Sequence, residues 1–177
     1  MKRMLAIVLL SSGMANAQDK PPQPDRWAPL RPLVGRWEGT GSSQAGTSTV
    51  STEFALVLDS QFIRVSNRSV IAPQENTPQG EVHDDVGYIS FDRQRDRHVL
   101  REFLSEGYVS QYTLDSVATE PMILVFTSEA LENAPPGMTA RLRYELSGGD
   151  TLRSWFELAF PGKDFSCFIQ QQLRRTP

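Results

Sequence analysis

Polar side chains interrupt several apolar, strand-like segments of this sequence, and these are the residues that could do chemistry. Arg101 and Glu102 are neighbours in one such segment, so either face of a strand would bring one of them inward. Residues of the same kind in other segments are Arg64, Tyr112, Tyr144 and Glu157. A buried guanidinium or phenol can pair with a carboxylate, and a carboxyl group in an apolar cavity can act as general acid or base. On the opposite face the same residues would meet solvent and cross-strand partners of opposite charge.

The residue patterns of common enzyme and metal sites are missing from the sequence. A single cysteine and two histidines exclude a multi-cysteine metal centre and argue against a multi-histidine one. There is no Gly-x-Ser-x-Gly elbow and no glycine-rich phosphate loop. We expect His83-Asp84-Asp85 to lie in a solvated loop and Cys167 to be buried in an apolar strand. No catalytic or metal-binding residue is therefore assigned.

Length, composition and charge limit the class of protein. The chain has 177 residues, of which 39% are hydrophobic, which suits one domain with a real core. Its formal net charge is −3 and no basic stripe is present, so a nucleic-acid partner is not expected.

The N-terminus has the pattern of a secretory signal peptide over residues 1–17. Lys2 and Arg3 precede an apolar run, and Ala15-Asn16-Ala17 predicts cleavage before Gln18. The run is shorter than the ~20 residues of a membrane-spanning helix, so we predict a periplasmic or secreted protein without a membrane span. Residues 18–32 form a proline-rich lead-in, in which Trp27 and Leu30 are expected to contact the domain as a lid or plug.

From residue 33 to 177, short segments rich in β-forming residues alternate with turn residues. We predict ten strands: Gly35–Gly41, Thr49–Leu58, Phe62–Val70, Val86–Phe91, His98–Ser105, Tyr108–Leu114, Met122–Ser128, Met138–Leu146, Leu152–Phe160 and Phe165–Arg174. Tight turns between consecutive strands make an antiparallel meander, and closure of a meander removes its exposed edges. The predicted fold is all-β: a single antiparallel up-and-down β-barrel of about ten strands, wide enough to hold a ligand. The longer connections 72–82 and 129–137 are either mobile loops at its mouth or ordinary surface loops.

The segment that opens the first strand, Leu33-Val34-Gly35-Arg36-Trp37, resembles the Gly-x-Trp signature of the calycin superfamily. That superfamily holds the lipocalins, the fatty-acid-binding proteins and the nitrobindin-like barrels, and the strand pattern is similar to small secreted bacterial calycin-like domains of unknown function. The resemblance implies a structural role for Gly35 and Trp37 at the closed end of the barrel. It also implies that a basic side chain of the last strand, Arg174 or Arg175, packs across the Trp37 ring.

The same resemblance implies which residues would bind a ligand. In fatty-acid-binding barrels, interior arginines and a tyrosine hold a carboxylate, which here suggests Arg101 with Tyr112 or Tyr144, or Arg64. Nitrobindin-like barrels bind haem through a histidine late in the barrel, but no histidine follows His98 in this sequence. Haem at His98 is therefore kept as an alternative, and no other cofactor is expected.

These observations predict a barrel that binds a small hydrophobic or amphipathic molecule in its interior, as a monomer or homodimer. One alternative is a cavity enzyme, an isomerase or hydrolase that uses Glu102 or Glu157 as acid or base. The others are a haem-binding barrel and a protein-interaction module whose pocket is filled by its own side chains.

Overall fold

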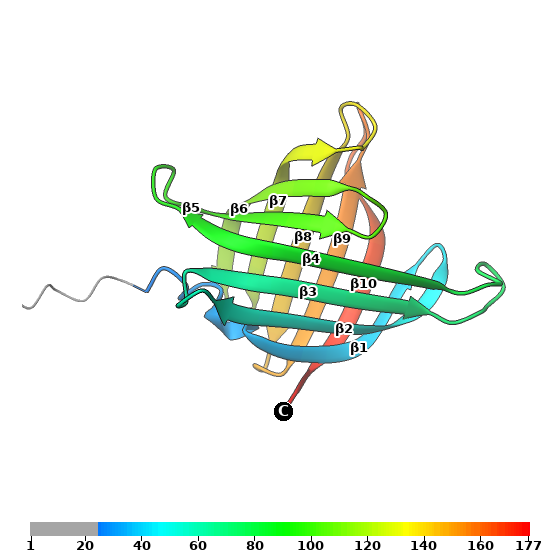
Figure 1. The fold of residues 1–177 in the computed structure, drawn as a ribbon, viewed down its shortest axis with the longest axis horizontal. Helices are drawn as coiled ribbons and strands as arrows, with labels where there is room; N and C mark the ends of the chain where they lie inside the picture. The colour runs from blue at the N-terminus through cyan, green and yellow to red at the C-terminus, as the bar shows by residue number, and fades with distance from the viewer. Residues whose placement is uncertain (1–24) are drawn as a thin grey trace, which may run out of the picture.

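The alternating segments form ten strands in the computed structural model, which describes residues 25–177 (Figure 1). The strands are β1 (Gly35–Ser43), β2 (Gly46–Val57), β3 (Phe62–Ile71), β4 (Glu81–Asp92), β5 (Arg97–Leu104), β6 (Val109–Thr119), β7 (Met122–Glu132), β8 (Thr139–Ser147), β9 (Thr151–Ala159) and β10 (Ser166–Thr176). One short 3-10 helix, η1 (Arg31–Leu33), precedes them. The predicted signal peptide and the first part of the lead-in lie outside the described residues.

Each strand pairs antiparallel with the next, and β1 pairs with β10 to close the sheet into a barrel. Figure 1 shows β1–β4 crossing the front of the molecule, with β8–β10 running steeply behind them. The prediction of an all-β, ten-stranded up-and-down barrel is confirmed.

Two strands extend into segments that the sequence analysis placed in loops. β4 begins at Glu81, and β7 continues to Glu132. Ile71, at the end of β3, pairs with Glu81, so a later start of β4 would leave backbone groups of β3 without partners. The prediction that His83-Asp84-Asp85 form a loop is therefore wrong, because they lie in β4 and alternate between its two faces.

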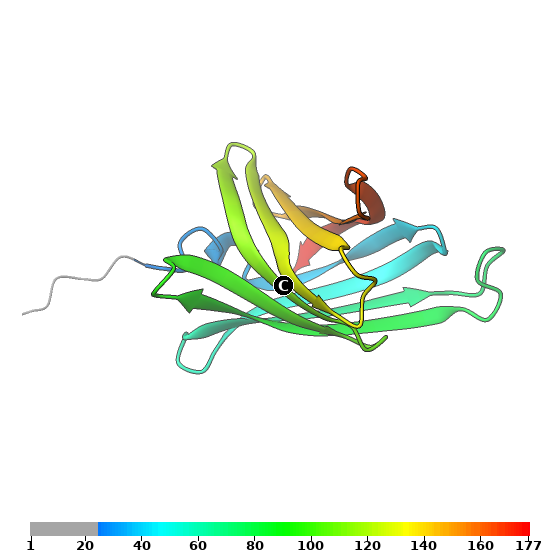
Figure 2. The ribbon, with the colours of Figure 1, turned by 90° about the horizontal axis from the view of Figure 1, so that it is seen from above.

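The segment before β1 plugs one end of the barrel. Trp27, Leu30 and Leu33 are each at most 3% exposed and join the core formed by the inward side chains of the strands. Figure 2 shows this segment at the same end of the molecule as the β2–β3 and β4–β5 turns. The predicted contact of Trp27 and Leu30 with the domain is thus present, and it takes the form of a plug.

The Gly-x-Trp motif positions this plug. Trp37 is fully buried and its indole Nε1 donates to the Leu33 carbonyl at 2.8 Å. The guanidinium of Arg175 lies 4.2 Å from the centre of the Trp37 ring and donates to the carbonyls of Val34 and Pro32. Gly35 has φ +136°, where an L side chain is strained, and a Cβ there would come 2.5 Å from Arg175 Nη1 and displace that guanidinium.

Of the two basic residues predicted as alternatives for this contact, Arg174 does not make it. It faces outward and pairs with Asp150 at 3.0 Å, because adjacent residues of a strand point to opposite faces. Arg175, opposite Trp37 in the β1–β10 register, fills the position instead.

The other end of the barrel is formed by the β1–β2, β3–β4, β5–β6, β7–β8 and β9–β10 connections. The β1–β2 and β3–β4 connections extend away from the plugged end in Figure 2. Within residues 25–177, no helix has the length and apolar character needed to cross a membrane.

Candidate functional site

A cavity of about 460 Å³ lies inside the barrel and reaches the end opposite the plug. Most of its lining is apolar, and much of that comes from β8 and β9. These apolar residues include Ala140, Leu142, Leu152, Phe156 and Leu158. Met138, Tyr108 and Phe160 line it near the connections between strands.

A row of polar side chains crosses the opposite wall on β2, β3 and β4. Thr52 Oγ1 donates to Asn67 Oδ1 at 2.8 Å, and Asn67 Nδ2 donates to Asp85 Oδ2 at 3.1 Å. The three residues are directly opposite one another in the strand registers, so the hydrogen bonds follow from the pairing itself. Asp85 ends the row at the cavity. Desolvation raises the pKa of Asp85 to about 6, although the Asn67 hydrogen bond opposes that shift.

Glu102 enters the same cavity from β5. It pairs in register with Gly87, and Asp85 pairs with Leu104, so the two carboxyl-bearing residues are diagonal neighbours. Diagonal positions on adjacent strands are about 7–8 Å apart, close enough for charges to interact in a water-poor interior. Desolvation raises the pKa of Glu102 to about 8, and the charge of Asp85 adds to the shift.

Two tyrosines complete this polar region. Tyr144 lines the cavity from β8 and packs edge-on against Phe54, 5.7 Å between ring centres. Tyr112 is buried on β6, diagonal to Glu102 across the β5–β6 pair. Desolvation, and after it the charge of Glu102, raises the pKa of both phenols. Both tyrosines of the predicted set thus lie inside the barrel.

The rim of the cavity carries a histidine between two glutamates. His83 contacts Glu106 through Nδ1 and Glu81 through Nε2, the latter at 3.3 Å. Burial lowers the pKa of His83, but the hydrogen bond and charge of Glu106 and the charge of Glu81 outweigh it, so the net shift is upward. Both ring nitrogens of His83 are therefore engaged at the rim.

The two arginines predicted to hold a ligand carboxylate do not reach the cavity. Arg64 points outward and pairs with Glu53 at 2.5 Å, while Arg101 is exposed and contacts Ser90 Oγ at 3.3 Å. Val65 and Glu102 are on the inward faces of β3 and β5. Arg64 and Arg101 precede them directly in the strands and therefore face outward. The predicted clamp of arginine with tyrosine is therefore not assembled.

The alternative carboxylates separate in the same way. Glu102 lies in the cavity, whereas Glu157 is outside it and accepts from Arg141 Nε at 2.7 Å. Only Glu102 of the two stands where an interior acid or base would be needed.

His98 does not suit a haem iron. Its ring is buried between Trp27 and Phe91, and its Nε2 donates to the Arg26 carbonyl at 2.7 Å. It belongs to the plugged end and is not a lining residue of the cavity. The residues present therefore do not fit haem at this position.

Cys167 differs from the prediction as well. It is exposed, and it lies where the β9–β10 register shifts between Cys167 and Ile169. The shift disrupts the alternation that the apolar segment suggested. Among residues 25–177, no group of three or more His, Cys, Asp or Glu residues is arranged to hold a metal ion.

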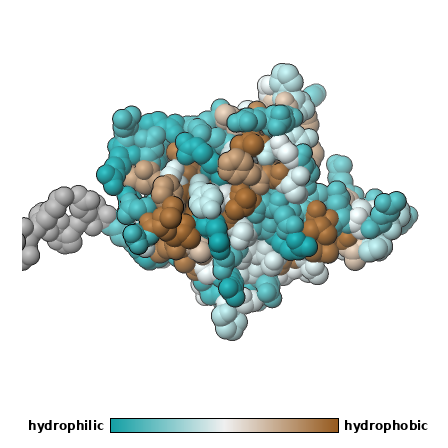
Figure 3. All heavy atoms as spheres, in the orientation of Figure 1, coloured by the Kyte–Doolittle hydropathy of each residue, from teal (hydrophilic) through white to brown (hydrophobic). Residues whose placement is uncertain are grey.

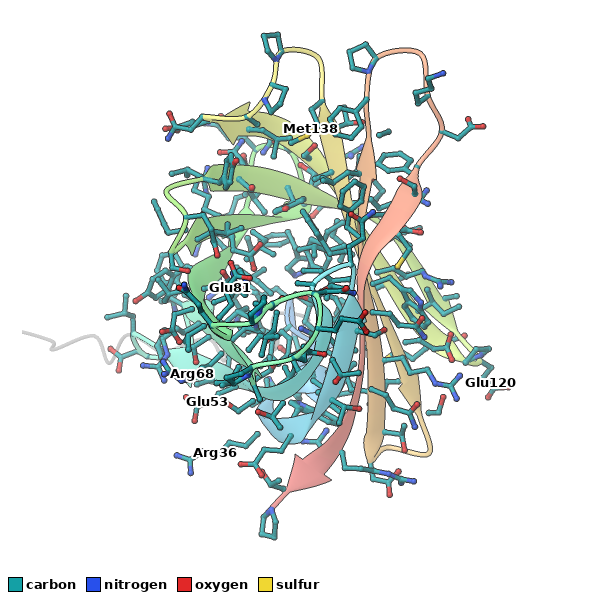
Figure 4. All side chains as sticks on the ribbon, turned by 90° about the vertical axis from the view of Figure 1, so that its right-hand side faces the viewer. Arg36, Glu53, Arg68, Glu81, Glu120 and Met138 are labelled. Atoms are coloured by element: carbon teal, nitrogen blue, oxygen red, sulfur yellow. The ribbon has the colours of Figure 1, made fainter. Side chains whose placement is uncertain are left out.

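A second hollow, also of about 460 Å³, lies along the outer side of β1–β4. Figure 4 shows Arg36, Glu53 and Arg68 together on this side, away from Met138. These charges pair among themselves: Arg36 with Glu53 at 3.0 Å, and Arg68 with Asp84 at 2.6 Å. Such mutual pairing leaves little unbalanced charge for a ligand.

The outer surface also exposes scattered apolar residues. Val86, Tyr88 and Phe103 on β4 and β5 are 41–48% exposed. The face in Figure 3 carries separate apolar patches within a mostly hydrophilic surface. One alternative was a protein-interaction module whose interior is filled by its own side chains. The interior holds a cavity of about 460 Å³ instead.

Sequence reasoning missed Asp85 and Asn67 as cavity residues. The available signal was strand length: a predicted nine-residue strand at Phe62–Val70 needs a partner of similar length, which extends β4 back through Asp85. Asp85 then shares parity with Gly87 and Ile89, both buried.

No family model matches the chain, and a search of curated proteins finds no match. Among solved structures, it is similar to Rv2717c from M. tuberculosis, with a TM-score of 0.64 and 16% identity over 86% of this chain and 98% of that one. At that identity the likeness supports the fold alone. A protein of unknown function from the DUF3598 family of Nostoc punctiforme also matches, with 8% identity over 87% of this chain and all of that chain. Its TM-score is 0.29, and no conclusion about this chain is based on it.

Proposed function

We propose that this barrel binds a small, mostly apolar molecule in its interior. The observation that carries the proposal is the 460 Å³ cavity, which is lined mainly by apolar side chains and reaches one end of the barrel. Ligand pockets in proteins typically have volumes of about 300–1,000 Å³, apolar walls and a few polar groups that orient the ligand. The plug closes the other end, so a ligand would enter between the connections near Met138.

The proposal includes the location of the protein. The signal-peptide pattern of residues 1–17 supports export, so the ligand would be met in the periplasm or outside the cell. Removal of Lys2 and Arg3 would change the net charge from −3 to −5.

A neutral reporter dye tests binding with a matched pair of variants. Ser69 and Ser66 are both half-buried on β3, but only Ser69 lines the cavity. We expect Nile red fluorescence to rise on addition of the wild-type protein and of Ser66→Phe. The rise should be much smaller with Ser69→Phe, because its ring occupies part of the cavity. Equal dye binding by the two variants would place the dye on the surface and contradict the proposal. Circular dichroism of both variants checks that the barrel is intact.

Glu102 favours a second candidate function, acid–base catalysis inside the cavity. Its carboxyl stays protonated near neutral pH while Asp85, close by, titrates about two units lower, and such separation suits an acid and a base. The test incubates any compound that copurifies with the protein with fresh wild type and with Glu102→Gln. Product formation by the wild type alone supports an isomerase or hydrolase, and an unchanged compound supports binding without turnover.

A further inference from the structure

Four of the side chains that line the cavity carry carboxyl groups: Asp85, Glu102, Glu106 and Glu132. The imidazole of His83 is the one basic group beside them among the lining residues of the described chain. No lysine or arginine of the described residues is among the lining residues. His83 already contacts Glu106 and Glu81, so its positive form would be balanced at the rim.

Glu102 and Asp85 have unused hydrogen-bonding capacity that faces the cavity. Within residues 25–177, the carboxylate of Glu102 makes no hydrogen bond or ion pair, and Asp85 is bonded by one oxygen only, to Asn67. A carboxyl group that faces an apolar cavity without a protein partner is available to a ligand that can pair with it.

We propose that the ligand is an amphipathic cation, an amine or quaternary ammonium with an apolar tail. This inference rests on the proposed function and names the ligand class for the same cavity. The cationic head would lie between Glu102 and Asp85, beside Tyr144, and the tail would lie along Leu142 and Phe156. Opposite charge in a water-poor site favours such pairing, and an aromatic ring adds to the attraction of a cation.

An anionic ligand meets the opposite situation. A fatty carboxylate would enter a cavity whose carboxyl groups repel it, while the arginines that could pair with it, Arg64 and Arg101, are on the outer face. A neutral alcohol would still bury its chain, and it would gain no ion pair. The three head groups should therefore bind in the order cation, alcohol, carboxylate.

Cation binding should also release a proton. The groups that face Glu102 are Asp85 on β4, Tyr112 on β6 and Tyr144 on β8, with His83 and Glu106 at the rim. Among these described neighbours there is no lysine or arginine that would pair with the carboxylate of Glu102. An ammonium beside Glu102 favours its ionised form, so affinity should rise with pH by up to about tenfold per unit below pH 8.

The experiment compares four probes of equal chain length by isothermal titration calorimetry of the whole protein at pH 6 and pH 8. The probes are decylammonium, decyltrimethylammonium, decanol and decanoate, each below the concentration at which it self-associates. At pH 8 we expect the two cations to bind roughly tenfold or more tightly than decanol, and decanoate to bind most weakly. The cations should gain affinity from pH 6 to pH 8, with heats that depend on the ionisation enthalpy of the buffer.

Two variants localise the effect. Glu102→Gln should weaken the binding of both cations several-fold at pH 8 and keep decanol binding, because only Asp85 remains to pair with the head group. Asp84→Asn, next to Asp85 but on the outer face, should change neither. Decanol or decanoate binding as tightly as the cations, or cation binding by Glu102→Gln as tight as that of the wild type, would overturn this inference and leave the proposed function intact. If no probe binds at either pH, the proposed function is overturned as well.

Discussion

At the residue scale, Arg174 and Arg175 show how one position in a strand decides a role. Arg175 stacks on Trp37 and bonds the carbonyls of the segment before β1, whereas Arg174 makes an exposed ion pair with Asp150. An arginine at position 175 therefore holds the closed end of the barrel, whereas an arginine at position 174 makes only a surface ion pair.

We predict that Arg175→Ala lowers the free energy of unfolding by roughly 2–3 kcal/mol. It removes a cation–π contact and charge-assisted hydrogen bonds to Val34 and Pro32. Arg174→Ala should cost at most about 0.5 kcal/mol, because exposed ion pairs contribute little. Urea unfolding of the two variants measures the difference, and equal losses would mean that the Trp37 contact does not hold the plug.

Glu102 should make the stability of the protein fall as pH rises. Its pKa is raised from 4.5 to about 8, so between these values the folded state holds a proton that the unfolded chain has lost. Unfolding free energy therefore decreases from about pH 4.5 to about pH 8, by an amount on the order of a few kcal/mol. Above pH 8 this contribution becomes constant.

Glu102→Gln should remove this loss. We predict that the variant gains stability over the wild type as pH rises from 5 to 9, measured as the difference in urea unfolding at the two values. Glu157→Gln, on the outer face and paired with Arg141, is the matched control and should show no such gain. A pH-independent difference for Glu102→Gln would show that the carboxyl group is well solvated in the folded protein.

At the element scale, Trp27 joins the plug to the barrel through contacts with the β2–β3 turn and with β5. The Trp27 indole donates to the Ser60 carbonyl at 2.8 Å and its ring packs 5.4 Å from that of His98. The side chain of its neighbour Arg26 donates to Gln61 at the surface, and its guanidinium lies 5.7 Å from the centre of the Trp27 ring.

We predict that Trp27→Ala costs about 3–5 kcal/mol, typical of a large aromatic removed from a core. Arg26→Ala should cost no more than about 1 kcal/mol, the size of one cation–π contact at an exposed site. Thermal unfolding followed by circular dichroism measures both. A small effect of Trp27→Ala would mean that the barrel is stable without its plug.

Alternation and turn residues sufficed to predict the ten strands and the closure of the barrel, while the place of Gly35 and Trp37 at its closed end was implied by a family resemblance. The sequence did not determine which face of β5 turns inward. Arg101 stands between Val99 and Phe103, and Glu102 between Leu100 and Leu104, so both faces have the same apolar and charged pattern. The structure decides between them through packing with distant strands, and the cavity becomes acidic instead of basic as a result.

At the scale of the whole molecule, the barrel is packed at one end and hollow toward the other. Bulky side chains such as Phe54, Phe126 and the plug residues fill the closed end. The lining of the cavity includes small residues such as Ser42, Ser69 and Ala140 beside larger ones. This division gives a stable core without filling the space that a ligand would need.

Native mass spectrometry of the protein, purified from the periplasm without added ligand and then incubated with the decyl probes, tests ligand binding most directly. We predict a chain that begins at Gln18 and carries an extra non-covalent mass, either from a copurified compound or from the cationic probes. Glu102→Gln should carry less of the cationic adducts. A wild-type spectrum that shows only the bare chain, before and after incubation with every probe, would contradict the account.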